Sequence, residues 1–339
     1  MSKKYSVAIV GATGAVGQEM MSTLERRKFP YGEVRLLASA RSAGKKLLFA
    51  GRELVVEELK ENSFEGIDIA LFSAGGSISK KFAPCAVKSG AVVVDNTSAF
   101  RMENDVPLVV PEVNPHDICK HKGIIANPNC STIQMVHILK PLHDAGKIKR
   151  VVVSTYQAVS GAGMKAIIEL EEETKALLEK KEYNRKVFPH QIAFNMLPRI
   201  PQSGGIEDGK YTNEEVKMMK ETKKIMGDHS IKVTATCVRV PVLRGHSESV
   251  NIELEREITV DDARKLLAAT PNVVVMDDID NEVYPMPNMC VGRFETFVGR
   301  IRKDDTVPHG LNLWIVSDNL LKGAALNSVQ IAEELIAKS

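Results

Sequence analysis

The sequence predicts an α/β protein of two domains, the first built on a parallel sheet and the second of mixed α+β type. The first observation is that the apolar, β-rich run at 5–10 leads into a glycine-rich turn, which is followed by apolar residues at helical spacing to about Arg27. The second is that short apolar runs continue beyond this helix with a helical stretch between them, in the rhythm of a parallel sheet with crossover helices. These are the runs at 34–38, 67–74 and 91–95, and the helical stretch at 77–88.

The third observation is a change of rhythm after residue 130, where strand-like and helical stretches alternate less regularly. We place the domains at 1–129 and 130–318, and we expect a C-terminal helix within 319–339 to complete the first domain. We interpret the acidic residues from Glu169 to Glu173 as the solvated face of a helix. The segments that indicate this organisation are strand-like runs at 149–159, 231–240 and 249–255, a charged helix at 163–182, and a hairpin inserted in the first domain at 47–56.

Composition narrows the class of ligand. The chain has 339 residues, 44% of them hydrophobic and 26% charged, which is typical of a soluble globular protein. The formal net charge is +2, without a basic block, so we expect a small-molecule substrate and neither nucleic acid nor membrane as a partner. The five cysteines show no CxxC pair and no metal-ligand spacing. We therefore expect no metal and no disulfide, and a cytoplasmic location.

The glycine-rich turn, "GATGAVG", is a GxxGxxG variant of the dinucleotide-binding fingerprint. Because it follows a strand and opens a helix, its context indicates a Rossmann-type domain that binds a pyrophosphate at the helix N-terminus. Its glycines stand where a side chain would obstruct the turn, the pyrophosphate or the helix–sheet contact. The predicted cofactor-binding residues of this turn are Gly11, Ala12, Thr13, Gly14, Ala15 and Val16.

The end of the second strand indicates which cofactor is bound. An NAD-dependent enzyme normally supplies an acidic residue there for the ribose hydroxyl, and this chain has none. Instead Ser39, Arg41 and Ser42 offer hydroxyl groups and a positive charge that suit a 2′-phosphate. The sequence therefore predicts NADP.

One of the cysteines, Cys130, lies between the polar "ANPN" and an apolar-periodic segment, so it is predicted near a helix start. Backbone N–H groups and the helix dipole favour a thiolate there. By itself such a cysteine is more often a small buried hydrophobe. A nucleotide domain followed by a nucleophilic thiol suggests acyl-level oxidation or reduction, which also needs a base. Among eight histidines we select His246, which shares its segment with Arg239 and Arg244.

In these motifs the sequence resembles the aspartate-β-semialdehyde dehydrogenase family. The matching pieces run in the family's order from residue 11 to residue 334, and "NPNCST" with "RVPVLRGHSE" separates this family from the fold-sharing acylphosphate reductases. The resemblance implies a glyceraldehyde-phosphate-dehydrogenase-like architecture, with a second domain that is catalytic and forms a homodimer. The other matching pieces include "ASARSAG", "NTSAFRM", "QAVSGAG", "EEVKMMKETKKI" and "SDNLLKGAALNSVQIAE".

The resemblance also implies individual roles. Cys130 would be the thioester nucleophile, His246 the acid/base catalyst and Gln157 the amide that orients the substrate. Arg239 would bind the substrate carboxylate, for which a planar guanidinium suits better than an ammonium. The remaining substrate-binding residues would be Glu214 for the α-ammonium group and Lys217 with Arg101 for phosphate, and the cofactor site would be completed by Ser160, Gly161 and Asn319.

The implied reaction is the NADPH-dependent reductive dephosphorylation of L-4-aspartyl phosphate to L-aspartate 4-semialdehyde, in lysine, threonine, methionine and diaminopimelate biosynthesis. Three alternatives stay open at this stage. The chain could be an N-acetylglutamyl-phosphate reductase, or a dinucleotide-binding sensor without catalysis. Glu214 and Lys217 could also be a plain surface ion pair at i,i+3 spacing.

Overall fold

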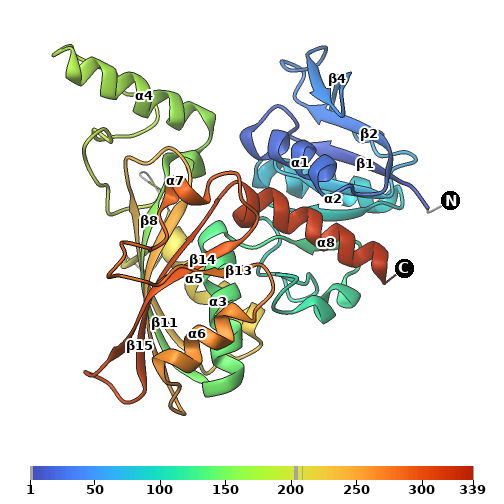
Figure 1. The fold of residues 1–339 in the computed structure, drawn as a ribbon. Coiled ribbons are helices and arrows are strands. Elements are labelled where there is room, and N and C mark those ends of the chain that lie inside the picture. Colours follow the sequence, from blue (N-terminus) through green and yellow to red (C-terminus); the bar gives the residue numbers. More distant parts are fainter. Residues whose placement is uncertain (1–2, 202–204, 208, 339) are drawn as a thin grey trace. The chain divides into compact units, whose positions relative to one another are not determined.

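The computed structural model describes residues 3–201, 205–207 and 209–338 (Figure 1). The chain divides into two compact units. The first comprises Met1–Asn129 together with Ala324–Ser339, and the second comprises Cys130–Gly323. The chain returns to the first unit at Ala324, a few residues later than the expected 319.

The first unit contains a seven-stranded sheet in the order β3-β4-β2-β1-β5-β6-β7. All neighbouring pairs are parallel except the β3–β4 hairpin. The central strands are buried on both faces, as expected of a parallel sheet covered by helices. The strands are β1 Tyr5–Val10, β2 Tyr31–Ala38, β3 Lys46–Phe49, β4 Arg52–Glu58, β5 Ile69–Phe72, β6 Val92–Asp95 and β7 Ile124–Ala126.

Helices cover both faces of this sheet and confirm the predicted Rossmann-type fold. One hydrophobic core joins the sheet to α1 (Ala15–Arg26) and α8 (Leu326–Ala337), and a second joins it to α2 (Gly76–Lys88). The helix α8, red in Figure 1, is buried along its first two turns. Arg27, directly after α1, makes a bidentate ion pair with Glu333 on α8, whose shortest N–O distance is 2.7 Å. The 3-10 helix η1 (Pro115–Lys120) also contacts α8.

The second unit contains a six-stranded mixed sheet in the order β11-β8-β12-β15-β14-β13. The helices α3, α5 and α6 pack on this sheet. Their bounds are α3 Cys130–Gly146, α5 Asn213–Met226 and α6 Val260–Ala268. The strands are β8 Ile148–Gln157, β11 Lys232–Arg239, β12 His246–Leu254, β13 Val273–Val275, β14 Thr296–Asp304 and β15 Gly310–Ser317, and the smaller elements are η2 Val159–Ala162, α4 Met164–Leu178, β9 Ile206–Glu207, β10 Tyr211–Thr212, α7 Pro287–Cys290 and the π-helical η3 Leu321–Ala325.

The acidic residues of α4 correct a sequence-based interpretation. Glu169 and Glu173 are buried rather than solvated, whereas Glu171 and Glu172 between them are exposed. The two buried carboxylates lie one turn apart on the same helix face, and the segment 186–193 crosses that face. They accept hydrogen bonds from its backbone N–H groups, which would otherwise be buried without partners. The donors are Lys186, Val187 and Phe188 for Glu169, and Ile192 and Ala193 for Glu173.

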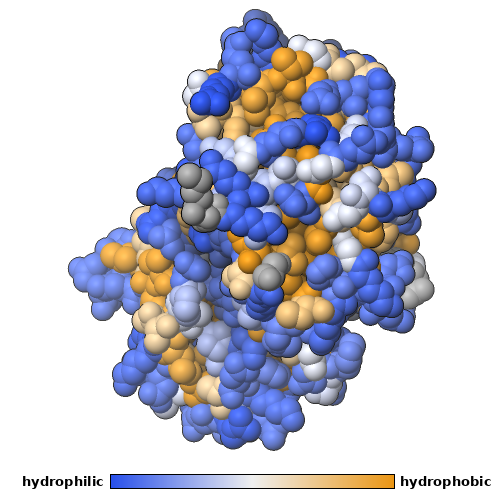
Figure 2. Space-filling view, turned by 90° about the vertical axis from the view of Figure 1, so that its right-hand side faces the viewer, coloured by the Kyte–Doolittle hydropathy of each residue, from blue (hydrophilic) through white to orange (hydrophobic). Residues whose placement is uncertain are grey.

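In the view of Figure 2 hydrophilic residues prevail, and the hydrophobic ones form several separate patches. No helix in the described part of the chain is both long enough and apolar enough to cross a membrane.

Candidate active site

The glycine turn of the first unit has the geometry of a phosphate cradle. Gly11 has φ +91°, which L-residues rarely adopt, and a Cβ on Gly17 would lie 2.3 Å from the Gly11 carbonyl oxygen. These two glycines are therefore required by the turn itself. Gly14 has an ordinary φ of −81° and precedes α1, whose first turn contains no acidic residue. An anion can thus approach the backbone N–H groups at this helix start.

The segment after β2 places the predicted 2′-phosphate residues in one tight turn. The backbone N–H of Ser42 donates to the Ser39 carbonyl oxygen at 2.8 Å, so the two hydroxyl-bearing residues lie close together. Ser39 and Arg41 are exposed, and the turn leads directly into β3. The turn offers both hydroxyl groups and a cation to a ligand.

Arg101, the first unit's predicted phosphate ligand, is buried and anchored by main-chain oxygens. Its Nε donates to the Asn127 carbonyl oxygen at 2.9 Å, and its Nη2 donates to that of Asn96 at 3.0 Å. Two main-chain acceptors therefore hold the guanidinium in one orientation, and its charge counteracts part of the rise that burial causes in the pKa of Asp95.

In the second unit, strand register brings three predicted residues, together with Ser317, to one end of the sheet. Arg239 on β11 pairs with Gln157 on β8, and His246 on β12 pairs with Ser317 on β15. Side chains of directly paired residues point to the same face of a sheet. We refer to these four paired residues at the strand ends, Gln157, Arg239, His246 and Ser317, as the end row. Residues far apart in sequence thus gather over one edge of the sheet.

Cys130 is the first residue of α3, which confirms its predicted position at a helix start. All five cysteines are thiols and none forms a disulfide. A Cβ on Gly323 would lie 2.9 Å from the Cβ of Cys130, so the absence of a side chain at Gly323 makes room for the thiol-bearing residue. Gly323 lies in η3, and π-helical segments are frequent at functional sites.

His246 is fully buried and its tautomer is determined by a backbone contact. The N–H of Ala158 donates to Nδ1 at 3.0 Å, so the proton of the neutral ring must reside on Nε2. Nε2 has no hydrogen-bond partner among the described residues. Burial, and secondarily the charge of Arg239, lower the pKa of His246 to about 3. At neutral pH the imidazole is therefore an uncharged group with one unused N–H donor.

Arg239 is 4% exposed and holds its guanidinium beside the same turn. Its Nη1 donates to the Ala158 carbonyl oxygen at 2.7 Å, while its Nε has no partner among the described residues. Burial lowers its pKa, whereas the nearby Glu214, Cys130 and Cys237 act in the opposite direction. A Cβ on Gly161 would lie 2.9 Å from Nη1 of Arg239 and 3.3 Å from Nε2 of His246. Gly161 therefore keeps open the space beside these two groups.

Gln157 and Lys217 both contact the buried carboxylate of Glu214. The Gln157 amide donates to one Glu214 oxygen at 3.1 Å, and the Lys217 ammonium lies 3.1 Å from the other. The i,i+3 ion pair considered from the spacing is thus formed, but one partner is buried and joined to the end row, so it is not a plain surface pair. The capping box of Thr212 and Glu215 fixes the start of α5, on which Glu214 and Lys217 lie.

Ser160 and Asn319 have an observed structural contact. The Asn319 amide donates to the Ser160 hydroxyl at 3.0 Å, and its oxygen accepts the Gly245 N–H at 2.8 Å. These contacts join the turn after β8 to the turn before β12. Gly245 has φ +95°, and a Cβ there would lie 2.9 Å from Pro287. Within the described residues, no group of three or more His, Cys, Asp or Glu side chains is placed to hold a metal ion.

Comparison with known proteins identifies the family. The profile of "Semialdehyde dehydrogenase, NAD binding domain" matches residues 6–121, and that of "Semialdehyde dehydrogenase, dimerisation domain" matches residues 139–322. The aspartate-semialdehyde dehydrogenase of Aquifex aeolicus is 61% identical over 336 residues, which cover 98% of both chains. That of Bacillus subtilis is 55% identical and covers 99% of this chain and 98% of its own. The chain belongs to the aspartate-semialdehyde dehydrogenase family.

Solved structures of family members agree with this assignment. The Vibrio cholerae aspartate semialdehyde dehydrogenase II, described as complexed with ASA, superposes with a TM-score of 0.96 at 47% identity and 99% coverage of both chains. A Candida albicans aspartate semialdehyde dehydrogenase, described as crystallised with NADP, has a TM-score of 0.77 at 28% identity, again over 99% of both chains. The predicted two-domain architecture is therefore confirmed.

Some residues that shape the site were absent from the sequence prediction. Ala158 contributes only backbone atoms, so no side-chain pattern could indicate its contacts with His246 and Arg239. Gly323 did carry a signal, because a glycine inside an amphipathic helical pattern costs stability and usually has a packing reason. Its packing against Cys130 is that reason.

Proposed function

We propose that this chain catalyses the NADPH-dependent reductive dephosphorylation of L-4-aspartyl phosphate to L-aspartate 4-semialdehyde, through a thioester on Cys130. The observation that carries the proposal is the arrangement in the second unit. Arg239 and His246 lie on either side of one small space, since a Cβ on Gly161 would be 2.9 Å from Nη1 of Arg239 and 3.3 Å from Nε2 of His246. Cys130 and Glu214 are close enough to Arg239 for their charges to raise its pKa. The site thus combines a nucleophile, Cys130, with a hydrogen-bond donor, His246. Arg239 and Glu214 provide opposite charges for the carboxylate and ammonium groups of an amino acid.

The first unit suits the cofactor. The positive φ at Gly11, the tight contact at Gly17 and the exposed Gly14 form a turn that a pyrophosphate can approach. We propose that Ser39, Arg41 and Ser42 favour NADP over NAD by binding the 2′-phosphate. When bound, the nicotinamide cofactor supplies the hydride. We also propose that Ser160, Gly161 and Asn319 take part in its binding.

Arg239 and Glu214 define the substrate class. The unused Nε–H of Arg239 is a buried cationic donor, which a substrate carboxylate satisfies with a charge-assisted hydrogen bond. Glu214, held by Gln157 and Lys217, is the matching anion for an α-ammonium group. A substrate with both charges fits this pair, whereas an N-acetylated amino acid has no ammonium group to place at Glu214. This favours aspartyl phosphate over N-acetylglutamyl phosphate.

The covalent steps follow from the position of Cys130. The thiolate, stabilised at the start of α3, attacks the acyl carbon and forms a C–S bond while the C–O bond to phosphate breaks. Arg101 and Lys217 are proposed to bind the departing phosphate. Hydride addition to the thioester gives a hemithioacetal alkoxide. Its C–S bond then breaks to release the aldehyde and return the thiolate.

The tautomer of His246 specifies what this residue does in those steps. Nε2–H, which has no partner among the described residues, can donate a hydrogen bond to the substrate oxygen on which negative charge develops. The acid/base role implied by the family resemblance requires an imidazolium ion, which burial and Arg239 disfavour. We therefore propose that His246 acts in the resting protein as a neutral hydrogen-bond donor.

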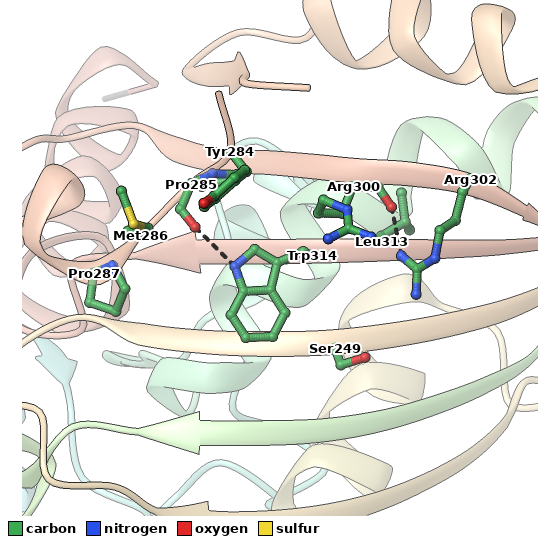
Figure 3. A pocket seen from close by; sticks show the side chains of 9 residues that line it. All are labelled: Ser249, Tyr284, Pro285, Met286, Pro287, Arg300, Arg302, Leu313 and Trp314. Atoms are coloured by element: carbon green, nitrogen blue, oxygen red, sulfur yellow. Dashed lines mark hydrogen bonds between the residues drawn. The ribbon is translucent and has the colours of Figure 1, made fainter. Parts of the chain in front are cut away.

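We propose that the second unit forms a homodimer in the cytoplasm. The profile that matches it is described as a dimerisation domain. The sheet face that carries Trp314 and Ser249 holds a pocket of about 350 Å³. Figure 3 shows Trp314 between Met286 and Pro287 at one end of this pocket and Arg300 and Arg302 at the other. Light scattering of Trp314→Glu tests whether this face associates, since a buried charge would disfavour a dimer.

The decisive test of function is phosphate-dependent reduction of NADP by aspartate semialdehyde, followed at the nicotinamide absorbance. We expect activity with aspartate semialdehyde and none with N-acetylglutamate semialdehyde.

Arg41→Ala should lower the preference for NADP over NAD about tenfold, as loss of one charge-assisted contact removes roughly 1.5 kcal/mol. An unchanged preference would assign the 2′-phosphate to other residues. Rapid iodoacetate labelling of Cys130, blocked by substrate, distinguishes the enzyme from a non-catalytic sensor.

A further inference from the structure

Glu248 is a buried carboxyl group that the proposed mechanism does not use. It lies on β12 two residues after His246, so both side chains point to the same face of the sheet. Its relative exposure is 0%, and within the described residues neither carboxyl oxygen makes a hydrogen bond of good geometry. A buried polar group without good partners is costly. Its presence beneath the site therefore calls for a physical explanation.

Strand register places Glu248 in the row directly below the end row. Glu248 pairs with Thr155 on β8 and with Ile315 on β15, and Thr155 pairs in turn with Cys237 on β11. The Thr155 hydroxyl donates to the Gln157 side-chain oxygen at 3.0 Å, so this lower row is already connected to the end row at one point.

Gln134 connects the two rows to the helix that carries Cys130. It lies one turn after Cys130 on α3, on the same helix face. Its amide nitrogen is 3.5 Å from the His246 carbonyl oxygen, and its side-chain oxygen accepts the Ser317 hydroxyl at 2.6 Å. Gln134 also lies within reach of the Glu248 carboxyl group, because its side chain counteracts part of the effect of burial on the pKa of Glu248.

We propose that Glu248 is a positioning residue of the active site: its carboxyl group holds the Gln134 amide, which ties the first turns of α3 to the paired strand ends of His246 and Ser317. This inference rests on the proposed roles of Cys130 and His246. It explains why a costly buried acid is present at this place. Among the described residues, the Gln134 side chain is otherwise held by its long hydrogen bond to the His246 carbonyl oxygen and by the Ser317 hydroxyl.

The charge state of Glu248 follows from its surroundings. Burial raises its pKa well above the ordinary value, and the Gln134 amide offsets only part of this. The nearby titratable groups are the Cys237 thiol on β11, whose own pKa is raised, and the neutral His246 on β12. None of these supplies a positive charge. Burial therefore favours the uncharged carboxylic acid, which has an O–H donor and a carbonyl acceptor, and a glutamine can replace it in both capacities.

The test compares Glu248→Gln with Glu248→Leu, and uses Glu253→Gln as a matched control at the far end of the same strand, where Glu253 pairs with Lys149. We expect Glu248→Gln to keep kcat within about threefold. Glu248→Leu should lower kcat about 10- to 100-fold, the usual effect of a small misplacement of reacting groups. The KM for aspartate semialdehyde should stay within about twofold in both, because Glu248 does not touch the substrate. Glu253→Gln should leave both constants unchanged.

A second readout does not depend on catalysis and so separates this inference from the proposed function. The rate of Cys130 alkylation by iodoacetamide is measured against pH. Glu248→Leu should move the midpoint upward, because a displaced first turn of α3 stabilises the thiolate less. Glu248→Gln should leave the midpoint in place. Should Glu248→Leu fail to fold, Gln134→Leu removes the same link from the helix side and carries the same expectations.

Three results would overturn the proposal. One is a folded Glu248→Leu, or Gln134→Leu in its place, with wild-type kcat and alkylation midpoint. Another is an equal loss of kcat in Glu248→Gln and Glu248→Leu, which would assign a role to the negative charge. The third is a double variant of Glu248→Leu and Gln134→Leu whose loss is the product of the two single losses, since residues that act through one contact are not independent.

Discussion

The fully buried, neutral His246 makes a quantitative prediction about stability. Its pKa is about 3 in the folded protein and about 6.5 in the unfolded chain, so between these values the unfolded state binds more protons. The stability associated with the neutral ring is therefore complete above pH 6.5 and is lost as pH falls toward 3. Linkage gives a loss of about 2 kcal/mol at pH 5 and less than about 0.1 kcal/mol at pH 7.5.

The perturbation that isolates this contribution is His246→Gln, which removes the titrating group and keeps a polar side chain. The free energy of unfolding is measured by urea denaturation of both proteins at the two pH values and equal protein concentration. Wild type should lose about 2 kcal/mol more than the variant between pH 7.5 and pH 5, because all other titrating groups are shared. A difference below about 0.5 kcal/mol would refute the reasoning, since it would mean that the folded site accommodates an imidazolium ion.

Three further substitutions test the site. Cys130→Ser should fold and bind NADP normally, yet lose nearly all turnover, because a serine hydroxyl stays protonated where a thiol ionises; steady-state rates and cofactor titration check this. Arg239→Lys should lower kcat/KM for aspartate semialdehyde, because an ammonium cannot form the planar two-point contact; the loss of transition-state stabilisation should be roughly 1–3 kcal/mol. An unaltered kcat/KM would assign the substrate carboxylate to another residue. Gly161→Ala should lower kcat at least tenfold, because the added Cβ would lie 2.9 Å from the Arg239 guanidinium and displace it. Since Gly161 is exposed, the free energy of unfolding should change by less than about 1 kcal/mol. A fully active variant would show that the guanidinium can move without consequence.

The local sequence determined the first unit in considerable detail. The strand–glycine turn–helix order, the inserted hairpin at 47–56 and the strands at 5–10 and 91–95 are all observed, because each depends on short-range periodicity and on glycines that the backbone itself requires. The helix start at Cys130 was likewise readable from neighbouring residues. By contrast, the acidic face of α4 was misinterpreted, because its partners lie in a segment that folds back from more than a dozen residues away.

The contacts of the site were decided by tertiary structure. Composition and motifs could name Cys130, Arg239 and His246, and family resemblance could assign them roles. Neither could show that a backbone N–H selects the tautomer of His246, or that Glu248 lies fully buried one row beneath it. These features arise from the register of β8, β11, β12 and β15, which pairs residues as far apart in sequence as Ile148 and Leu254. Periodicity within one segment specifies which face a side chain occupies, but only the pairing of distant strands determines which side chains share that face.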